Sequence, residues 1–384
     1  MENNATLTPD RPILANQAPS QHAKSTFFRP SLLVGLIYVL LLGFFVTVRH
    51  YSAFDFIHLG TVWGLHIKSG TWGYDGQFYY QIARNPLGAA QYMDNAPYRY
   101  QHLLYPLVAW LLSLGQAPLV PYALLLINLV AIVGSVEIVA RLLVKAGLSP
   151  WFSLALGLYY GLAVGLTFDT TEPFTCMLLC LGIWSLEKKQ WALAALWMGL
   201  ATISREIAVL FPLCLAASFV WNRRWKETFY FIVLGVLPLS IFLGVLTLIF
   251  GHTGVSFGPP FEHIPFAGIF DFRHTPHKFW LLVLVMLLPT LLSLGFLAWD
   301  LIHLRFNQMT LVWAANLGMM VLLSHSTYAE LVSCGRVSIV AILAGVLYGV
   351  KTRNKTLLWA LQIYVCTFVV YFIGTLLHLD SFIA

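Results

Sequence analysis

The chain has 384 residues, of which 59% are hydrophobic and only 10% are charged, and its net charge is +6. Soluble domains carry roughly a quarter of charged residues, so this chain has too few polar side chains to cover a water-soluble core. The basic residues form short clusters between apolar runs, a pattern typical of membrane proteins that argues against nucleic acid as a partner.

Residues 1–30 are polar and rich in Asn, Pro and Ser, which predicts a disordered cytoplasmic tail. Residues 31–384 then form one integral membrane domain. Because a spanning helix needs about 20 apolar residues, the sequence predicts an all-α, polytopic transmembrane bundle with about 11 spans. These spans cover residues 31–48, 120–143, 151–167, 172–186, 191–204, 206–221, 228–250, 280–298, 309–324, 337–350 and 356–377.

Basic clusters between these spans predict the orientation, since positively charged connections stay in the cytoplasm. The alternate segments then form outer loops, of which the first covers about residues 49–119. Within it, the apolar run 103–116 is too short to span and predicts an interfacial or re-entrant helix. The clusters are Arg141 with Lys145, Lys188 with Lys189, Arg223 with Arg224 and Lys226, His303 with Arg305, and Lys351 with Arg353 and Lys355.

Two stretches are predicted to be hairpins of short helices. Residues 191–221 would form a single helix roughly 47 Å long, although both ends carry cytoplasmic-type charge. A single span would place its two ends on opposite sides of the membrane, so the sequence predicts a hairpin with its tip at 204–206. Residues 151–186 predict a second hairpin with its tip at 169–173. Charged tips below the membrane surface require a water-filled cavity that opens to the outside.

The first outer loop contains Asp75 between glycine and aromatic residues, with Tyr74 and Gln77 beside it. Asp75 is placed to cap a helix whose apolar face, with Phe78 and Ile82, would lie flat on the membrane. Asp75 is equally placed to accept a proton from a sugar hydroxyl. Spacing alone leaves both roles open, and the position at a membrane–cavity boundary favours catalysis.

The remaining candidate residues lie near the end of the first loop, at the two hairpin tips and in the last outer loop. A snorkelling arginine in an aromatic belt, or an ion pair that only closes the bundle, are the structural alternatives. Isolated charges within a membrane are costly, which favours function for the set. Together with Tyr74 and Gln77 of the first loop, the substrate-binding residues that we expect are Arg99, Tyr100, His102, Asp169, Glu172, Arg205, Glu206 and Arg336.

The histidine-rich loop 251–279 has no spacing typical of zinc sites. The sequence therefore indicates no metal site and no cofactor, and assistance by a divalent metal stays open. It also contains no Walker A loop, Rossmann glycines or Gly-x-Ser-x-Gly elbow, which disfavours an ATP-driven machine.

Three segments together resemble the GT-C superfamily of polytopic glycosyltransferases, which use polyprenyl-phosphate-linked sugars. The segment GYDGQFYYQIARNP resembles the first-loop acidic motif, especially its form in the mannosyltransferases of GPI-anchor assembly. The stretch PYRYQHLLYPLVAWLL is similar to an arginine–tyrosine stretch of that superfamily, and residues 171–212 look like its Thr-Glu-Pro and Arg-Glu hairpins. Similar segments occur in bacterial proteins of cell-surface glycopolymer formation. Unlike many members, this chain has a single acidic residue in the first motif, Asp75, followed by glycine.

The resemblance implies transfer of a hexose such as mannose from a polyprenyl-phosphate donor to a lipid or glycan acceptor on the extracytoplasmic face. Asp75 would be the general base of an inverting displacement, and Arg205 or Arg336 would stabilise the leaving phosphate. It also implies a bacterial plasma-membrane location. The alternatives are a flippase or transporter of lipid-linked sugars, and a polymerase or ligase of surface polysaccharide.

Overall fold

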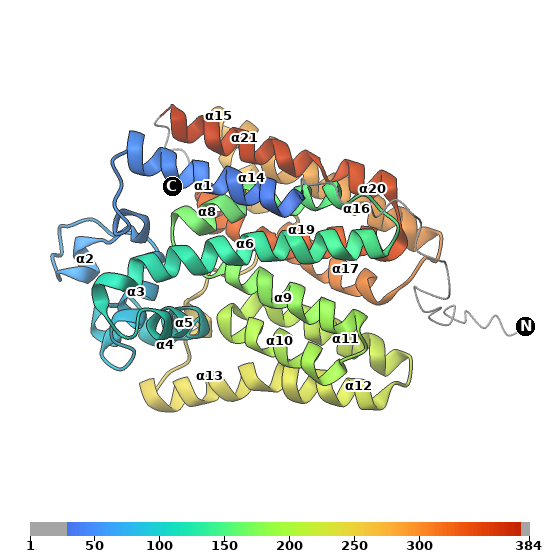
Figure 1. The fold of residues 1–384 in the computed structure, drawn as a ribbon, viewed down its shortest axis with the longest axis horizontal. Coiled ribbons are helices and arrows are strands. Elements are labelled where there is room, and N and C mark those ends of the chain that lie inside the picture. Colours follow the sequence, from blue (N-terminus) through green and yellow to red (C-terminus); the bar gives the residue numbers. More distant parts are fainter. Residues whose placement is uncertain (1–28, 378–384) are drawn as a thin grey trace, which may run out of the picture.

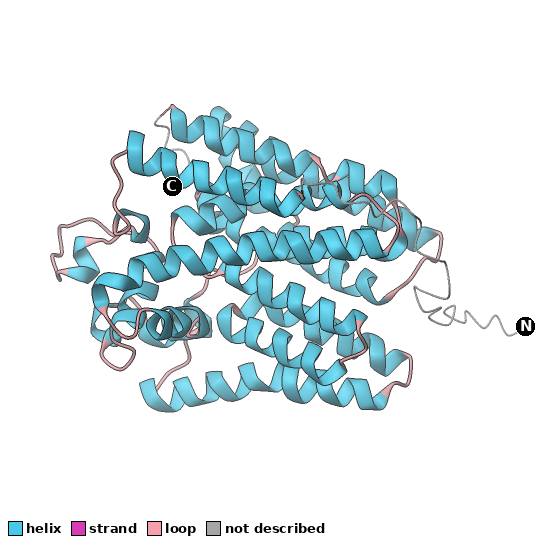
Figure 2. Ribbon diagram, in the orientation of Figure 1, coloured by secondary structure: helices cyan, strands magenta, loops and turns pink. Residues whose placement is uncertain are grey.

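The computed structural model describes residues 29–377, and helices dominate this part of the chain. Between residues 29 and 377 no strand occurs (Figure 2). The predicted all-α fold class is therefore confirmed. The predicted tail at residues 1–30 lies almost wholly outside the described residues and stays a prediction.

Within residues 29–377, six helical segments are long and apolar enough to cross a membrane. The shortest has 19 residues, or about 28 Å at 1.5 Å per residue, which is close to a hydrocarbon core of about 30 Å. π-helical stretches at Phe231–Val236 and Val283–Leu287 join the halves of two of these segments. The six are α1 (Pro30–Val48), α6 (Val120–Lys145), α12 with α13 (Trp225–Tyr230, Leu237–Phe250), α15 with α16 (Pro276–Leu282, Leu288–Ile302), α19 (Leu331–Thr352), and α20 with α21 (Lys355–Ala360, Ile363–Leu376).

All eleven predicted segments are helical, but eleven full spans are not confirmed. Helices α7 (Leu154–Gly157) and α8 (Tyr160–Thr167) belong to a segment bent by 53°, which adds at most a seventh span. A helix of 16 residues, the longest of the remaining four, is about 24 Å long and falls short of the hydrocarbon core. The structure therefore supports a multi-pass helical membrane protein, and the number of crossings stays a prediction. The four short helices are α9 (Glu172–Glu187), α10 (Trp191–Ser204), α11 (Leu210–Trp221) and α17 (Gln308–Val321).

Both predicted hairpin tips are confirmed. Helix α10 ends at Ser204, Arg205 has extended backbone with φ −152° and ψ 121°, and the chain reverses into a short turn before α11. Helix α8 ends at Thr167, and α9 begins at Glu172. Pro173 lies in the first turn of α9, where proline is tolerated because the backbone N–H groups of a first turn have no partner within the helix.

The first outer loop folds into four short helices: α2 (Thr61–Gly64), α3 (Gly76–Arg84), α4 (Ala96–Tyr100) and α5 (Leu104–Leu112). Helix α5 has nine residues, about 14 Å, too short to span, as predicted. The prediction that residues after Asp75 lie flat on the membrane is wrong. Residues 76–83 are buried, because α3 packs against α5 and α6 instead of lipid.

Figure 1 shows that the two ends of the bundle differ. The first outer loop gathers at one end, at the left of the view, whereas the turns between α9 and α10, α11 and α12, and α19 and α20 lie at the opposite end. Those turns carry the basic clusters, so the positive-inside rule predicts that the end with α3 faces outward. Helix α19 lies in the middle of the bundle and is the most deeply buried of the long helices. Two further short helices, α14 (Ala267–Phe270) and α18 (His325–Ala329), precede it.

Candidate functional site

A cavity of about 220 Å³ lies at the end of the bundle that carries the first outer loop. Asp75, Arg99 and Arg336 line it together with aromatic side chains from the loop. These three charged residues come from the start of α3, from α4 and from α19, so the fold brings together positions far apart in the sequence. The aromatic and polar residues of its lining include Trp63, Trp72, Phe78, Tyr74, Glu330 and Ser333.

Asp75 precedes α3, but its side chain makes no capping hydrogen bond. Instead, Oδ1 accepts a hydrogen bond from Arg99 Nη1 at 2.7 Å, and Oδ2 accepts one from Arg336 Nη2 at 2.8 Å. Burial by itself raises the pKa of Asp75, but the positive charges of Arg99 and Arg336 outweigh burial and hold this pKa far below its usual range. Asp75 is therefore ionised, and the helix-cap alternative does not describe its role.

Arg99 is held in place by its own short helix and by a second carboxylate. Asn95 caps α4 by accepting a hydrogen bond from the Tyr98 backbone N–H. Asp94 accepts two hydrogen bonds from Arg99, at 2.8 Å from Nε and 2.6 Å from Nη2. The guanidinium also lies 4.2 Å from the centre of the Phe78 ring, a cation–π contact. Arg99 consequently presents one remaining nitrogen, Nη1, to Asp75.

Arg336 projects from the buried middle helix α19 and is 4% exposed. Its guanidinium lies 4.8 Å from the centre of the Tyr74 ring, and Nη1 lies 3.9 Å from Glu172. Within the described part of the chain, Arg336 Nε and Nη1 donate no hydrogen bond. Buried donors of this kind are costly unless a ligand or water satisfies them, so Arg336 is a candidate anion-binding residue.

Behind the cavity, the two hairpin tips contribute a second set of charges. Arg205 Nε lies 3.5 Å from Glu172, and Arg205 Nη1 lies 3.0 Å from His102 Nε2. His102 Nε2 also lies 2.6 Å from Glu206. Burial lowers the pKa of His102 despite the neighbouring carboxylate. With its proton on Nε2 the ring donates to Glu206, whereas with its proton on Nδ1 the ring accepts at Nε2 from Arg205 Nη1.

Eight side chains thus form one continuous network in which acidic and basic members largely alternate. Its four carboxylates outnumber its three arginines, so the arginine charge is balanced within the network itself. The network runs, in order of contact, through Asp94, Arg99, Asp75, Arg336, Glu172, Arg205, His102 and Glu206.

Gly76 explains why a second side chain cannot follow Asp75. A Cβ atom at position 76 would lie 2.4 Å from the carbonyl oxygen of Phe168 and 2.9 Å from that of Ile57. These contacts join the start of α3 to the tip of the first hairpin, and backbone atoms there have little room to move. Any acidic residue at position 76 would therefore separate the two elements that place Asp75.

Replacing Gly76 with alanine is expected to lower the free energy of unfolding by about 1–3 kcal/mol, because the added methyl group overpacks this contact. Thermal unfolding of the purified protein measures the effect. Gly43→Ala in α1 is the matched control, since a Cβ there meets no atom within 4 Å and alanine favours a helix. Equal stability of the two variants would contradict the tight approach at Gly76.

Of the predicted site residues, Asp75, Tyr74, Arg99 and Arg336 line the cavity. The Tyr74 hydroxyl contacts Ser333 at 2.8 Å and donates to Glu330 at 3.2 Å. Glu172, Arg205, His102 and Glu206 lie behind it in the network. Gln77 borders the cavity, but its amide is bonded to the backbone of Gly60 and Trp72, so it holds the loop together.

Two further predicted residues belong neither to the cavity lining nor to the network behind it. Tyr100 donates its hydroxyl to the Pro86 carbonyl and packs in an apolar cluster with Phe78 and Met93, because α4 turns that ring away from the cavity. Asp169 is fully buried at the hairpin tip with φ 46°, and neither carboxylate oxygen accepts a hydrogen bond from any described residue. Asp169 therefore does not join Glu172 in one acidic site.

Sequence reasoning missed Asp94 and the tryptophans Trp63 and Trp72. Asp94 is one of the few acidic residues of the first loop and lies five positions before Arg99. That charge pair was the available signal. The tryptophans have no such signal, because exposed aromatic residues are also common at membrane interfaces.

Comparisons of the chain with protein-family models, with curated proteins and with solved structures find no match in any of the three. The resemblance to GT-C glycosyltransferases therefore rests on the quoted motifs alone and stays a prediction. Across residues 29–377, no group of three or more His, Cys, Asp and Glu side chains is placed to hold a metal ion.

Proposed function

We propose that this protein is a glycosyltransferase that moves a hexose, such as mannose, from a polyprenyl-phosphate donor to a lipid or glycan acceptor. The observation that carries the proposal is the position of Asp75 between Arg99 and Arg336 in a cavity lined by aromatic rings. A carboxylate base and guanidinium groups for a phosphate are the two functions that such a transfer requires.

In the proposed reaction, an acceptor hydroxyl attacks the anomeric carbon of the donor sugar. The bond from that carbon to the phosphate oxygen breaks, and its electron pair leaves with polyprenyl phosphate. Asp75 takes the proton of the attacking hydroxyl. Arg336 binds the departing phosphate monoester, because a guanidinium suits phosphate geometry and its Nε and Nη1 have no hydrogen-bond partner among the described residues.

The paired state of Asp75 fits an order of events in this reaction. A carboxylate held by two arginines has a low pKa and is a weak base. A donor phosphate that binds Arg336 removes one of the two positive charges from Asp75, so the pKa of Asp75 rises toward its ordinary value. The base would therefore gain strength when the donor is bound.

The size and lining of the cavity fit one part of such a donor. At about 220 Å³ it is smaller than the about 300–1,000 Å³ of sites that enclose a whole small-molecule ligand. It suits a single sugar ring, with the polyprenyl chain left in the membrane. Trp63 and Trp72 offer apolar ring faces against which the C–H groups of a sugar can pack.

The test is a transfer assay with purified protein in proteoliposomes, supplied with radiolabelled undecaprenyl-phosphate mannose or glucose and with membrane lipids and glycans as acceptors. We expect label in the acceptor fraction and an equal amount of released polyprenyl phosphate. A transporter of lipid-linked sugars would move the donor between leaflets without cleaving it. Movement of intact donor, or no cleavage of either donor, would contradict the proposal.

A further inference from the structure

A large cavity lies at the other end of the molecule from Asp75. It has a volume of about 890 Å³ and lies between α16 and the turn from α19 to α20. Figure 1 places this turn at the end with the basic connections. The volume falls within the about 300–1,000 Å³ of sites that enclose a whole ligand. We call this cavity, lined by residues of α16, α19 and α20, the α16–α20 groove.

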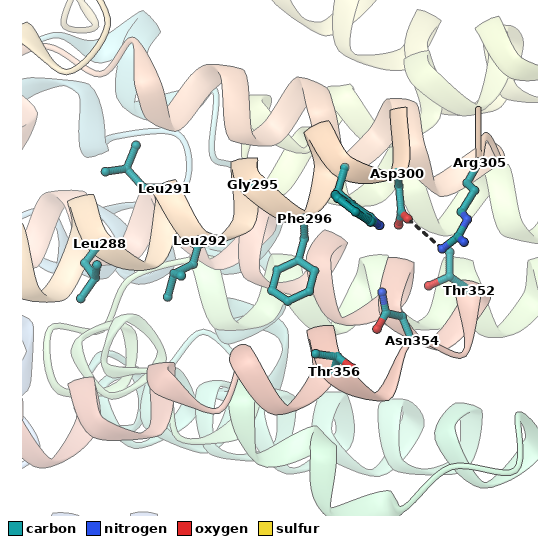
Figure 3. Close-up of a pocket in the computed structure, with 11 residues that line it drawn as sticks. Leu288, Leu291, Leu292, Gly295, Phe296, Asp300, Arg305, Thr352, Asn354 and Thr356 are labelled. Carbon is teal, nitrogen blue, oxygen red and sulfur yellow. Dashed lines mark ion pairs between the residues drawn. The ribbon is translucent and has the colours of Figure 1, made fainter. Parts of the chain in front are cut away.

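The groove is apolar along one part and polar at its end. Figure 3 shows Leu288, Leu292 and Phe296 in a row along α16, whereas Arg305, Thr352 and Asn354 gather at the far end. Along α16 the rise from Leu288 to Phe296 is about 12 Å. This division matches a molecule with a hydrocarbon chain and a polar headgroup.

The groove also opens to the surface that faces lipid. Leu291 and Leu292 are 48% and 42% exposed, and Trp299 is 59% exposed, although all three lie on a helix that is long enough to cross the membrane. Exposed apolar side chains on such a helix face acyl chains, and tryptophan favours the boundary between hydrocarbon and headgroups. A ligand can therefore enter sideways from the bilayer.

The polar end is cationic. Asp300 is buried and accepts a hydrogen bond from the Tyr348 hydroxyl at 2.7 Å, so one partner already satisfies it. Arg305 lies 3.5 Å from Asp300, but its side chain is 63% exposed and has donors left for a second anion. Thr352, Asn354 and Thr356 of the lining alternate in sequence with Lys351, Arg353 and Lys355. Arg305 belongs to the lining itself, and Lys351, Arg353 and Lys355 are chain neighbours of lining residues, so this end of the groove is richer in basic than in acidic residues.

We propose that the α16–α20 groove binds an anionic glycerophospholipid of the leaflet on the side of the basic turns. Its phosphate contacts Arg305 and Asn354, and one acyl chain lies along Leu288, Leu292 and Phe296. Basic pockets between transmembrane helices on the cytoplasmic side are suited to anionic lipid headgroups. The site is separate from the cavity at Asp75, so this proposal does not depend on the glycosyltransferase reaction.

Two substitutions test the two halves of the site. Gly295 lines the groove, and a Cβ there meets no atom within 4 Å, so Gly295→Phe fills the groove without a clash at its own backbone. Gly244→Phe is the matched control, since Gly244 lies on α13, is exposed and also has open space at its Cβ. Arg305→Gln removes the exposed cation and leaves the bond from Tyr348 to Asp300.

The full-length protein is equilibrated in nanodiscs of equal parts phosphatidylglycerol and phosphatidylcholine, and native mass spectrometry counts the lipids that stay bound. We expect wild type and Gly244→Phe to retain phosphatidylglycerol preferentially. Gly295→Phe loses this bound lipid. Arg305→Gln lowers the preference by about fivefold, the factor expected for one cation that faces an anionic lipid.

Three results would overturn the proposal. The first is equal retention of the two lipids by wild type. The second is retention of phosphatidylglycerol by Gly295→Phe, or an unchanged preference in Arg305→Gln. The third is displacement of phosphatidylglycerol by an equimolar amount of undecaprenyl phosphate, which would make a polyprenyl carrier the occupant.

Discussion

Replacing Asp75 with asparagine is expected to lower the rate of hexose transfer by about 10²–10⁴-fold, the range for loss of a general base. The amide keeps the size of the side chain but cannot take the proton of the acceptor hydroxyl. The fold should survive, because Arg99 keeps Asp94 and Arg336 keeps Glu172 as neighbours. The measurement is the initial rate with a radiolabelled polyprenyl-phosphate hexose at equal amounts of purified protein.

Asp94→Asn is the control for this experiment. Asp94 lines the same cavity and accepts two hydrogen bonds from Arg99, which donates a third to Asp75. The Asp94 carboxylate is however fully engaged by that arginine, and we assign it only a positioning role. Asp94→Asn should retain most of the transfer rate. An equal loss in both variants would mean that both carboxylates serve to hold Arg99, and Asp75 would not be the base.

Replacing Arg336 with glutamine is expected to have the second largest effect. Loss of a group that stabilises the leaving phosphate lowers the transfer rate by about 10²–10³-fold. The same change leaves Glu172 in the buried network with Arg205 as its remaining cation, at 3.5 Å. Removal of one partner from a buried ion pair destabilises a protein by about 3–5 kcal/mol. Transfer rate and thermal unfolding are therefore measured together.

A second variant separates catalysis from stability. Glu172→Gln removes the carboxylate that Arg336→Gln leaves behind, so the double variant should recover much of the lost stability. The factor by which Arg336→Gln lowers transfer should stay similar in the Glu172→Gln background, if Arg336 acts on the phosphate. Recovery of the transfer rate together with stability would show that Arg336 is only structural.

Local pattern was sufficient to predict the helical segments and their interruptions. Residues 191–221 are too long for one span and carry charge in the middle, so a hairpin with its tip at Arg205 followed from length and charge alone. Pro173 marked the start of α9 in the same way. Length could not decide how many segments cross the membrane, because α9, α10 and α17 are apolar but short, and neighbouring helices bury them.

The sequence also pointed to most of the charged site residues, because a charge within an apolar chain is conspicuous wherever it occurs. It could not tell whether Asp75 caps a helix or joins an ion pair, since a residue before a helix fits both descriptions. That choice depends on Arg336, which is 261 positions away and meets Asp75 only through the packing of α19 against the first loop. For the same reason the sequence could not show that Asp169, three residues from Glu172, takes no part in the ion pairs of Glu172.

By itself, then, the sequence determined the helical class, the membrane character and the end of the bundle at which charge would gather. These properties follow from composition and periodicity, because they depend on interactions between residues that are close in the chain and on interactions with the surrounding solvent. Only the tertiary structure decided which carboxylate meets which arginine, which apolar segments form short helices, and where the α16–α20 groove lies. Such properties depend on distances between residues far apart in sequence, and those distances are set by the packing of the whole bundle.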